Sequence, residues 1–319
     1  MDVSIIIVSW NTRAVLKNCL DSIYQKTRGV SFEVIVIDNA SGDGSAEMVK
    51  RGFPGVILIE NCRNRGFAAA NNQGMAVATG RYILLLNSDT LVMDQTITET
   101  VFFADYNPEA AVVGCRVLNK DGTLQPSCFM FPSIGNMLLS SSYLYKLFHR
   151  SHFFGREGMT WWDRDDTREV DVVTGCFMLA RSEAIRQVGV MDERFFMYGE
   201  ETDWCYRFKK AGWKILFTPA AEIVHLGGQS SRHVSDKMIV QLRLSILQFI
   251  EKHHGWLTYK LACFFTALFF AVRVPMWLMV SVFAPERRGQ AGIKLRAYFS
   301  GIVQVLSAFS SGLAREGSV

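Results

Sequence analysis

The sequence predicts an α/β protein with a mostly parallel central sheet, helices on both faces of that sheet, and a group of apolar helices at the C-terminus. Continuous runs of β-branched and aliphatic residues alternate with helix-like segments over the first part of the chain. Such alternation is typical of parallel strands joined by right-handed helical crossovers. Polar residues cluster where the predicted strands end, and the longest apolar runs lie after Glu251.

The predicted strands are short apolar runs without strict alternation, as expected for strands buried on both faces. The segments between them carry apolar residues at helical spacing. The strands are predicted at residues 3–9, 32–38, 56–60 and 82–87, and the helices between them at residues 12–25, 45–52 and 66–79.

The middle of the chain is less regular. We expect a strand at residues 112–118 and a partly helical insertion over residues 133–170. A helix at about 201–211, a strand near 214–217 and a helical apolar stripe over 237–255 follow.

Composition limits the classes of function. The chain has 319 residues, 49% hydrophobic and 20% charged, which is enough for a sizeable core. A net charge of +4 does not call for nucleic acid as a partner. The seven cysteines include no CxxC pair, which argues against a zinc site or a disulfide framework. The N-terminus lacks a basic segment before its first apolar run, so no secretory signal is predicted and a cytoplasmic location is favoured.

The C-terminal region indicates contact with a membrane. From Glu251 to Val319 there are eight Lys or Arg and three Asp or Glu, which suits an anionic surface. Residues 257–284 are long enough to span a bilayer, but Lys260, Arg273 and Pro275 interrupt them. We expect a break at Arg273 and a kinked hairpin or interfacial helices lying in the cytoplasmic leaflet. The alternative is a buried helical pair packed on the body of the protein.

Hydrogen-bonding side chains follow three of the predicted strands. In open α/β sheets, ligands bind beyond the carboxyl ends of the strands. The residues at these ends are therefore expected to converge on one crevice: Ser9 and Asn11, then Asp38 and Asn39, then Asn87, Ser88 and Asp89.

Five motifs in this order resemble a family 2 glycosyltransferase of the GT-A fold, in its rhamnosyltransferase-like branch. They are "SIIIVSWN", "VIDNASGDGS", "NRGFAAANNQG", "GRYILLLNSDT" and "FFMYGEETDWCYRFKKAGW…H". The resemblance covers roughly residues 3 to 228. It implies a GT-A catalytic domain over residues 1–230, with a donor half (1–115) and an acceptor half (116–230). A helical, membrane-associating region would occupy residues 231–319.

The resemblance implies a set of residues that bind the nucleotide and the donor sugar. Asp38 would accept hydrogen bonds from the base or ribose, although a turn role also explains it. Gly66 would allow close approach to the ligand, with tight helix–sheet packing as the alternative. Relatives often have Arg where this chain has Asn71, which leaves the base open. The full implied set is Ser9, Asn11, Asp38, Asn39, Gly66, Asn71, Asn87, Ser88 and Gly175.

The resemblance also implies a divalent metal, Mg²⁺ or Mn²⁺, beside the donor diphosphate. The segment "NSD" has the spacing of the family's DxD motif, with Asn87 in the first position and Asp89 as the metal ligand. His225, which follows the acidic motif by the family's usual spacing, is the second implied ligand. A strand-end cap for Asp89 and a packed histidine are the alternatives.

The segment "YGEETDW" is implied to carry the general base, which removes the proton from the acceptor hydroxyl. The family's usual base corresponds to Glu201, while Glu200 and Asp203 could share or take the role. Three carboxylates in the first turn of a helix are also explained by the helix dipole alone.

The resulting expectation is an inverting glycosyltransferase at the cytoplasmic face of the membrane. It would move a sugar, L-rhamnose from dTDP-rhamnose in the first instance, to a lipid-linked glycan in bacterial cell-surface polysaccharide synthesis. The alternatives are another hexose from a UDP or GDP donor, or an inactive nucleotide-sugar-binding partner subunit; a homodimer is also left open. A nicotinamide-dependent enzyme is excluded because "SWNTRA" after the first strand contains no glycine.

Overall fold

The computed structural model describes residues 1–141, 144–227 and 235–311. These residues form two compact units. The first comprises Met1–Phe131, Trp162–Phe196 and residues 200–227, and the second comprises residues 132–141, 144–161, 197–199 and 235–311. The predicted domain boundary at residue 230 lies outside the described residues, as do the predicted C-terminal residues 231–234 and 312–319.

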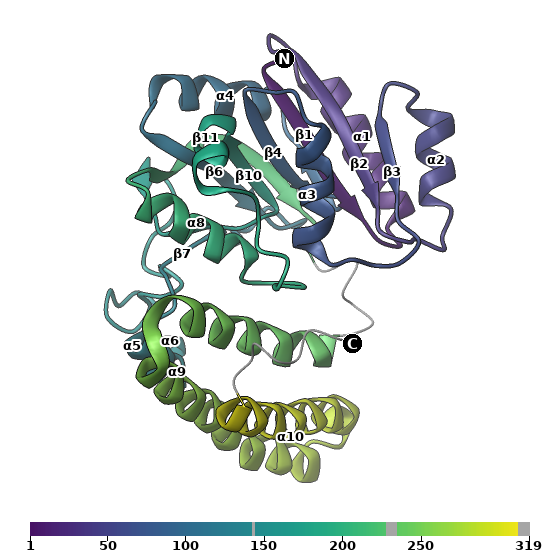
Figure 1. The fold of residues 1–319 in the computed structure, drawn as a ribbon. Helices are drawn as coiled ribbons and strands as arrows, with labels where there is room; N and C mark the ends of the chain where they lie inside the picture. Colours follow the sequence, from purple (N-terminus) through teal and green to yellow (C-terminus); the bar gives the residue numbers. More distant parts are fainter. Residues whose placement is uncertain (142–143, 228–234, 312–319) are drawn as a thin grey trace. The chain divides into compact units, whose positions relative to one another are not determined.

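The first unit is built on a mixed sheet that is parallel over its first half (Figure 1). β1 pairs in parallel with β2 and β4, and β2 with β3. The part of the sheet that the structure describes has nine strands. Eight are in the order β3 (Ile57–Glu60), β2 (Phe32–Asp38), β1 (Val3–Ser9), β4 (Tyr82–Asn87), β10 (Phe177–Arg181), β6 (Ala110–Leu118), β11 (Lys214–His225) and β5 (Thr90–Val92), and β8 (Arg168–Glu169) pairs with β11.

Helices cover both faces of the sheet, as predicted. On one face, Ile5 and Ile7 of β1 join the buried residues of α1 and α4 in a single core cluster. On the other face α3 packs so closely that a Cβ added at Gly74 would lie 2.6 Å from Ile6 Cγ2 (Figure 1). The helices of this unit are α1 (Arg13–Lys26), α2 (Ser45–Gly52), α3 (Phe67–Val77), α4 (Thr96–Tyr106), α7 (Ser182–Val188) and α8 (Glu200–Lys210).

The strands of the first half lie where their apolar runs predict them. The second half departs from the sequence pattern at β10 and β11. β10 runs antiparallel between β4 and β6. β11 extends to His225, well beyond the predicted residues 214–217, because a register shift between Thr218 and Glu222 accommodates Pro219. A second, small sheet pairs β7 (Cys128–Phe129) with β9 (Val172–Val173).

The second unit is helical. Its elements are α5 (Ile134–Ser141), α6 (Leu144–Leu147), α9 (Ser235–Phe283), the 3-10 turn η2 (Pro285–Arg287) and α10 (Arg288–Ser311). Over its described residues α9 has one non-helical residue, Gly255, with φ 79° and ψ 169°. The segment Met238–Phe283 is long and apolar enough to cross a membrane by length and composition.

The predicted break at Arg273 is wrong, because α9 continues through this residue and through Pro275. Arg273 is only 2% exposed. Its Nη1 donates to the Phe269 carbonyl at 2.7 Å, and its guanidinium carbon lies 3.4 Å from the centroid of the Phe269 ring. A charge accommodated in this way along its own helix does not end that helix.

Candidate active site

The ends of β1 and β4 are tied together by hydroxyl groups. Ser9 Oγ lies 2.9 Å from Thr12 Oγ1, and Thr12 Oγ1 donates to Ser88 Oγ at 3.0 Å. All three side chains are buried. In the sheet, Ser9 pairs with Asp38 and Val8 pairs with Asn87. The structure therefore brings the three predicted strand ends to one edge of the sheet.

Asp38 is buried at the end of β2, with 4% of its surface exposed. Its Oδ2 accepts a hydrogen bond from the Ser41 amide at 2.9 Å, which is the expected turn role. Its Oδ1 is buried and, among the described residues, has no hydrogen-bond partner. Because a buried carboxylate oxygen is costly to leave without a donor, Oδ1 is suited to a ligand donor.

Asn11 and Asn39 hold neighbouring loops. Asn11 adopts a left-handed backbone (φ 53°), and its Oδ1 accepts from the Gly42 amide at 2.8 Å. Asn39 is 2% exposed, and its side chain binds the loop that precedes α3. Its Nδ2 donates to Asn64 Oδ1 at 2.8 Å, and its Oδ1 accepts from the Arg65 amide at 3.0 Å. Both amides thus shape the rim of the site.

The glycines at this edge allow close packing within the protein. Gly66 has φ 82°, and a Cβ there would lie 2.4 Å from the Phe196 carbonyl oxygen. The Phe67 amide donates to that same oxygen at 2.9 Å. A Cβ at Gly175 would lie 3.1 Å from the Phe67 ring. Gly66 therefore packs closely against the loop at Phe196, and not against the sheet as the packing alternative expected.

The paired asparagines of α3 have separate partners. Asn71 is buried, and its Nδ2 donates to the Phe67 carbonyl one turn earlier at 2.9 Å. Asn72 Nδ2 donates to the Met191 carbonyl at 2.9 Å, and its Oδ1 accepts from the Met191 amide at 3.1 Å. Asn72 therefore fixes the segment after α7 against α3.

Asp89 and His225, the two residues that the resemblance implies as metal ligands, lie side by side. Asp89 Oδ1 is 3.1 Å from His225 Nε2, and both side chains are largely buried. Asn87 Nδ2 lies 3.2 Å from the same nitrogen. The pairing of β5 with β11 sets this geometry, because Thr90 lies opposite His225 and the Leu226 amide donates to the Asp89 carbonyl at 2.9 Å.

This oxygen and nitrogen pair fits a divalent cation such as Mn²⁺. Three or more His, Cys, Asp or Glu side chains grouped for a metal do not occur in the described part of the chain. Cations of this type are commonly held by one or two protein ligands, with substrate phosphates and water completing the set. Asp89 and His225 match the protein's share of such a site.

The three carboxylates at the start of α8 have different surroundings. Asp203 is fully buried and accepts from Arg207 Nε at 2.9 Å. Arg207 also donates to the carbonyls of Val188 and Val190. Glu200 is 3% exposed, whereas Glu201 is half-buried. Tyr198 and Gly199, immediately before α8, have left-handed backbones (φ 65° and 85°).

Cys176 lies within electrostatic reach of both groups of carboxylates. Burial, followed by the negative charges of Asp89 and Glu201, raises the pKa of the Cys176 thiol to about 11, although a hydrogen bond with Thr174 opposes the shift. The Cys176 carbonyl accepts from the Asn87 amide at 3.2 Å. This thiol therefore stays protonated at neutral pH.

The sequence patterns missed Thr12, Gln125, Phe196 and Arg207. Gln125 lies in a stretch without periodicity, yet its Oε1 is 2.8 Å from His225 Nδ1, a residue one hundred positions away. Contacts over such separations leave no local signal in a single sequence.

Comparison with known proteins places these features in a family. A model described as "Glycosyl transferase family 2" matches residues 4–189. An N-acetylglucosaminyl-diphospho-decaprenol L-rhamnosyltransferase of Mycobacterium tuberculosis is 27% identical over 237 residues, covering 70% of this chain and 76% of the relative. The low-salt glycan biosynthesis hexosyltransferase Agl10 of Haloferax volcanii is 25% identical over 233 residues, covering 70% and 67%.

Solved structures share the fold. The mannosyltransferase PcManGT from Pyrobaculum calidifontis, in complex with GDP-Man and Mn²⁺, superposes with a TM-score of 0.57 at 17% identity, covering 95% of this chain and 86% of that one. A crystal structure of S. aureus TarS 1–349 gives 0.51 at 12% identity, covering 98% and 92%. The fold is therefore GT-A-like, with a long apolar C-terminal helix added.

Proposed function

Since this chain belongs to glycosyl transferase family 2, we propose that it transfers L-rhamnose from dTDP-rhamnose to a lipid-linked glycan, with inversion at the anomeric carbon. The rhamnosyltransferase of Mycobacterium tuberculosis, whose name gives a diphospho-decaprenol substrate, supports this donor sugar and acceptor class. The observation that carries the proposal is the Asp89–His225 pair, at 3.1 Å, at the same edge of the sheet as the buried Oδ1 of Asp38.

Asp38 Oδ1 is proposed to accept a hydrogen bond from the base or ribose of the donor, because the described residues leave this buried oxygen without a donor. Ser9, Ser88 and Asn87 extend the same polar edge toward Asp89. Asn11, Asn39, Gly66, Asn71 and Gly175 are proposed to shape this donor site through the contacts described above.

Asp89 and His225 are proposed to hold Mg²⁺ or Mn²⁺ against the donor diphosphate. When bound, the cation supplies positive charge that stabilises the departing nucleoside diphosphate. Asp89 contributes a carboxylate oxygen, and His225 contributes Nε2. Both side chains come from well-packed strand ends, so little reorganisation is needed.

Glu201 is proposed as the general base. Its carboxylate takes the proton of the acceptor hydroxyl as the hydroxyl oxygen bonds to the anomeric carbon. The bond from that carbon to the phosphate oxygen breaks at the same time, and the phosphate oxygen keeps the electron pair. A single displacement of this kind inverts the configuration. Glu200 and Asp203 are proposed to orient Glu201 or bind the acceptor.

The second unit is proposed to lie against the cytoplasmic leaflet of the membrane, where lipid-linked acceptors would be presented. Large apolar side chains of α9 and α10 are exposed in this unit, among them Phe264, Val303 and Leu306. Arg287, Arg288 and Arg296 are exposed near the start of α10 and suit anionic headgroups.

A hexosyltransferase with a UDP or GDP donor is the second candidate, because the Haloferax volcanii relative is named a hexosyltransferase without a stated sugar. A donor screen separates the two candidates. Released nucleoside diphosphate is measured with dTDP-, UDP- and GDP-sugars in membranes that contain lipid-linked glycan. We expect the highest turnover with dTDP-rhamnose.

Asp89→Ala is the decisive variant in this screen. We expect it to lower turnover by at least about a hundredfold, because it removes the cation that stabilises the leaving group. Asp94→Ala, at an exposed aspartate of the same segment, is the matched control and should retain activity. Equal turnover in wild type and Asp89→Ala would refute the proposed site.

A further inference from the structure

His225 is held from both of its ring nitrogens. On one side Nε2 lies 3.1 Å from Asp89 Oδ1 and 3.2 Å from Asn87 Nδ2. On the other side Nδ1 lies 2.8 Å from Gln125 Oε1. The orientation of the ring is therefore set by groups from two separate segments of the chain, one at residues 87–89 and one at Gln125.

The backbone that carries Gln125 is itself fixed. Its amide donates to the Val117 carbonyl at 2.8 Å, which places Gln125 beside β6. β6 is the strand that pairs with β11, which ends at His225. The preceding turn is closed by the Asn119 amide, which donates to the Thr123 carbonyl at 2.8 Å. Gly227 packs beside the amide group, since a Cβ there would lie 3.5 Å from Gln125 Nε2.

This arrangement selects one form of the imidazole. A glutamine oxygen can only accept a hydrogen bond, so Nδ1 must carry the proton. In a neutral imidazole the other nitrogen, Nε2, then keeps its lone pair. The Asn87 Nδ2 amide group, 3.2 Å away, can donate to it, and Asp89 Oδ1 lies 3.1 Å from the same nitrogen. Histidines that ligate metals depend on such an acceptor behind the ring, which fixes both tautomer and orientation.

We infer that Gln125 is a positioning residue that holds the Nε2 lone pair of His225 toward Asp89 and so prepares the protein's half of the cation site. The inference rests on the metal role proposed for Asp89 and His225. A glutamine adds no charge, so it orients the ring without changing the charge of the cation site.

Binding of Mn²⁺ tests the inference without measuring catalysis. The full chain is titrated with Mn²⁺ in the presence of dTDP, and free Mn²⁺ is followed by electron paramagnetic resonance. Gln125→Leu should weaken binding about 10- to 100-fold. Gln125→Glu keeps an acceptor oxygen behind Nδ1 and should bind close to wild type.

Gln187→Leu is the matched control. Gln187 Oε1 also accepts from a ring N–H, that of Trp213 at 2.7 Å, so the control removes the same kind of bond elsewhere in the fold. It should leave Mn²⁺ binding unchanged. Equal weakening by both leucine variants would indicate general destabilisation and would overturn the inference.

A spectroscopic measurement adds a second readout. In protein labelled with ¹⁵N-histidine, His225 should show a protonated Nδ1 and an unprotonated Nε2 in wild type, and a mixture of tautomers in Gln125→Leu. An unchanged tautomer together with unchanged Mn²⁺ binding in Gln125→Leu would overturn the inference. If Asp89→Ala also bound Mn²⁺ as wild type does, the proposed metal site itself would be wrong. If Asp89→Ala lost Mn²⁺ binding and Gln125→Leu did not, the metal site would stand and only the role of Gln125 would be wrong.

Discussion

The three carboxylates that open α8 differ in what holds them. Asp203 is buried and paired with Arg207, which also binds carbonyls at the end of α7 and beyond it. That is the environment of a structural ion pair, in which removal of one partner strongly destabilises the fold. Glu201 is half-buried and contributes to the field at Cys176, which lies next to Asn87 in the sheet edge. At the scale of single residues, these surroundings support the proposal that Glu201 is the general base.

We predict that Glu201→Gln lowers kcat by about 10²- to 10⁴-fold, the usual contribution of a general base. The KM for the nucleotide-sugar should stay within a small factor, because the donor site is untouched. Steady-state release of nucleoside diphosphate measures both constants. Glu183→Gln is the matched control, since Glu183 is an exposed acid in the first turn of α7.

Asp203→Asn should act on stability instead. Loss of the carboxylate leaves the partly buried Arg207 without its partner, and we expect a cost of about 3 kcal/mol in urea unfolding. If Asp203→Asn abolished turnover while its unfolding free energy stayed at the wild-type value, Asp203 would be the base.

Among the secondary-structure elements, the start of α3 is the tightest junction of the candidate site. Gly66 combines a left-handed backbone with the close approach of the Phe196 carbonyl. Gly122 also has a left-handed backbone (φ 80°), but no described atom lies within 4 Å of a Cβ built there. An alanine at Gly122 would therefore cause backbone strain alone, whereas an alanine at Gly66 would add steric overlap to that strain.

Gly66→Ala should destabilise the protein by more than about 3 kcal/mol, because an added methyl overlaps a backbone oxygen that cannot move freely. Gly122→Ala should cost only about 1 kcal/mol, from backbone strain alone. Urea unfolding of both variants checks this difference. Similar losses would mean that the contact with Phe196 is not a tight one.

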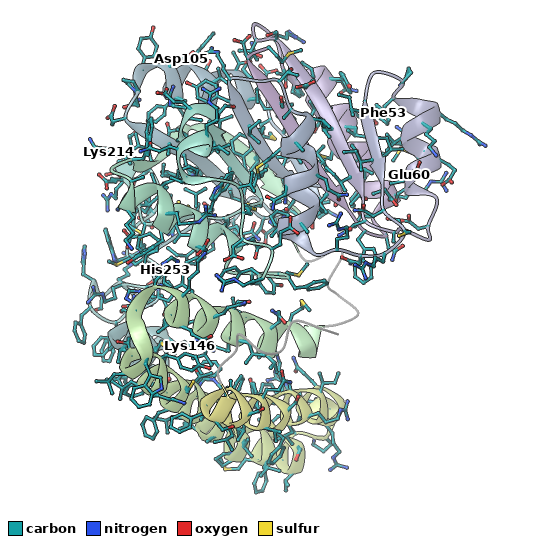
Figure 2. All side chains as sticks on the ribbon, viewed as in Figure 1. Phe53, Glu60, Asp105, Lys146, Lys214 and His253 are labelled. Carbon is teal, nitrogen blue, oxygen red and sulfur yellow. The ribbon has the colours of Figure 1, made fainter. Side chains whose placement is uncertain are left out.

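The N-terminal ends of β1, β2 and β4 are tied by charged groups. Hydrogen bonds from the Ser31 hydroxyl and amide, with a smaller contribution from Arg81, lower the pKa of Asp2 to about 2. Arg81 also pairs with Asp105 at the end of α4, labelled in Figure 2, and lowers the pKa of that carboxyl. Both aspartates therefore interact more strongly with these neighbours in their ionised form than in their protonated form.

A folded pKa below the unfolded value of about 3.9 gives stability that is present above pH 4 and is lost as the pH falls toward 2. Asp2→Asn should therefore lower the unfolding free energy at pH 7 by no more than about 1 kcal/mol, since the pair is partly exposed. The difference from wild type should shrink between pH 4 and pH 2. A gap that stays constant over this range in urea titrations would argue against this linkage.

The sequence predicted the first four strands closely, because each is a buried apolar run with a polar end. It could not predict that β10 lies antiparallel beside β4, since strand pairing depends on residues far apart in the chain. The prediction of a helix break at Arg273 was wrong, because the Phe269 ring and carbonyl that accommodate the charge are visible only in the fold. The same holds for Gln125 behind His225.

At the scale of the whole molecule, the proposed membrane contact rests on the large apolar side chains that the helical unit exposes. We predict that the full chain floats with vesicles rich in anionic lipid, and less with zwitterionic vesicles or at high salt. Replacing Phe264, Val303 and Leu306 by Asp should weaken binding more than tenfold, because each exposed apolar side chain is lost from the interface.

Phe102→Asp with Tyr106→Asp is the control for this experiment, because these exposed aromatic residues belong to α4 in the first unit. This variant should float as wild type does. Flotation that is insensitive to all of these changes would place the membrane contact elsewhere in the chain.

The antiparallel insertion of β10 has a consequence for biosynthesis. Leu86 of β4 pairs with Phe177, and Thr90 of β5 pairs with His225. A nascent chain that has emerged only through β4 therefore exposes an apolar strand edge until the ribosome has added the distant partner strand. Such long-range pairing is slow and leaves open edges prone to association. We expect translation pauses before residue 225 to yield the intermediates that chaperones bind.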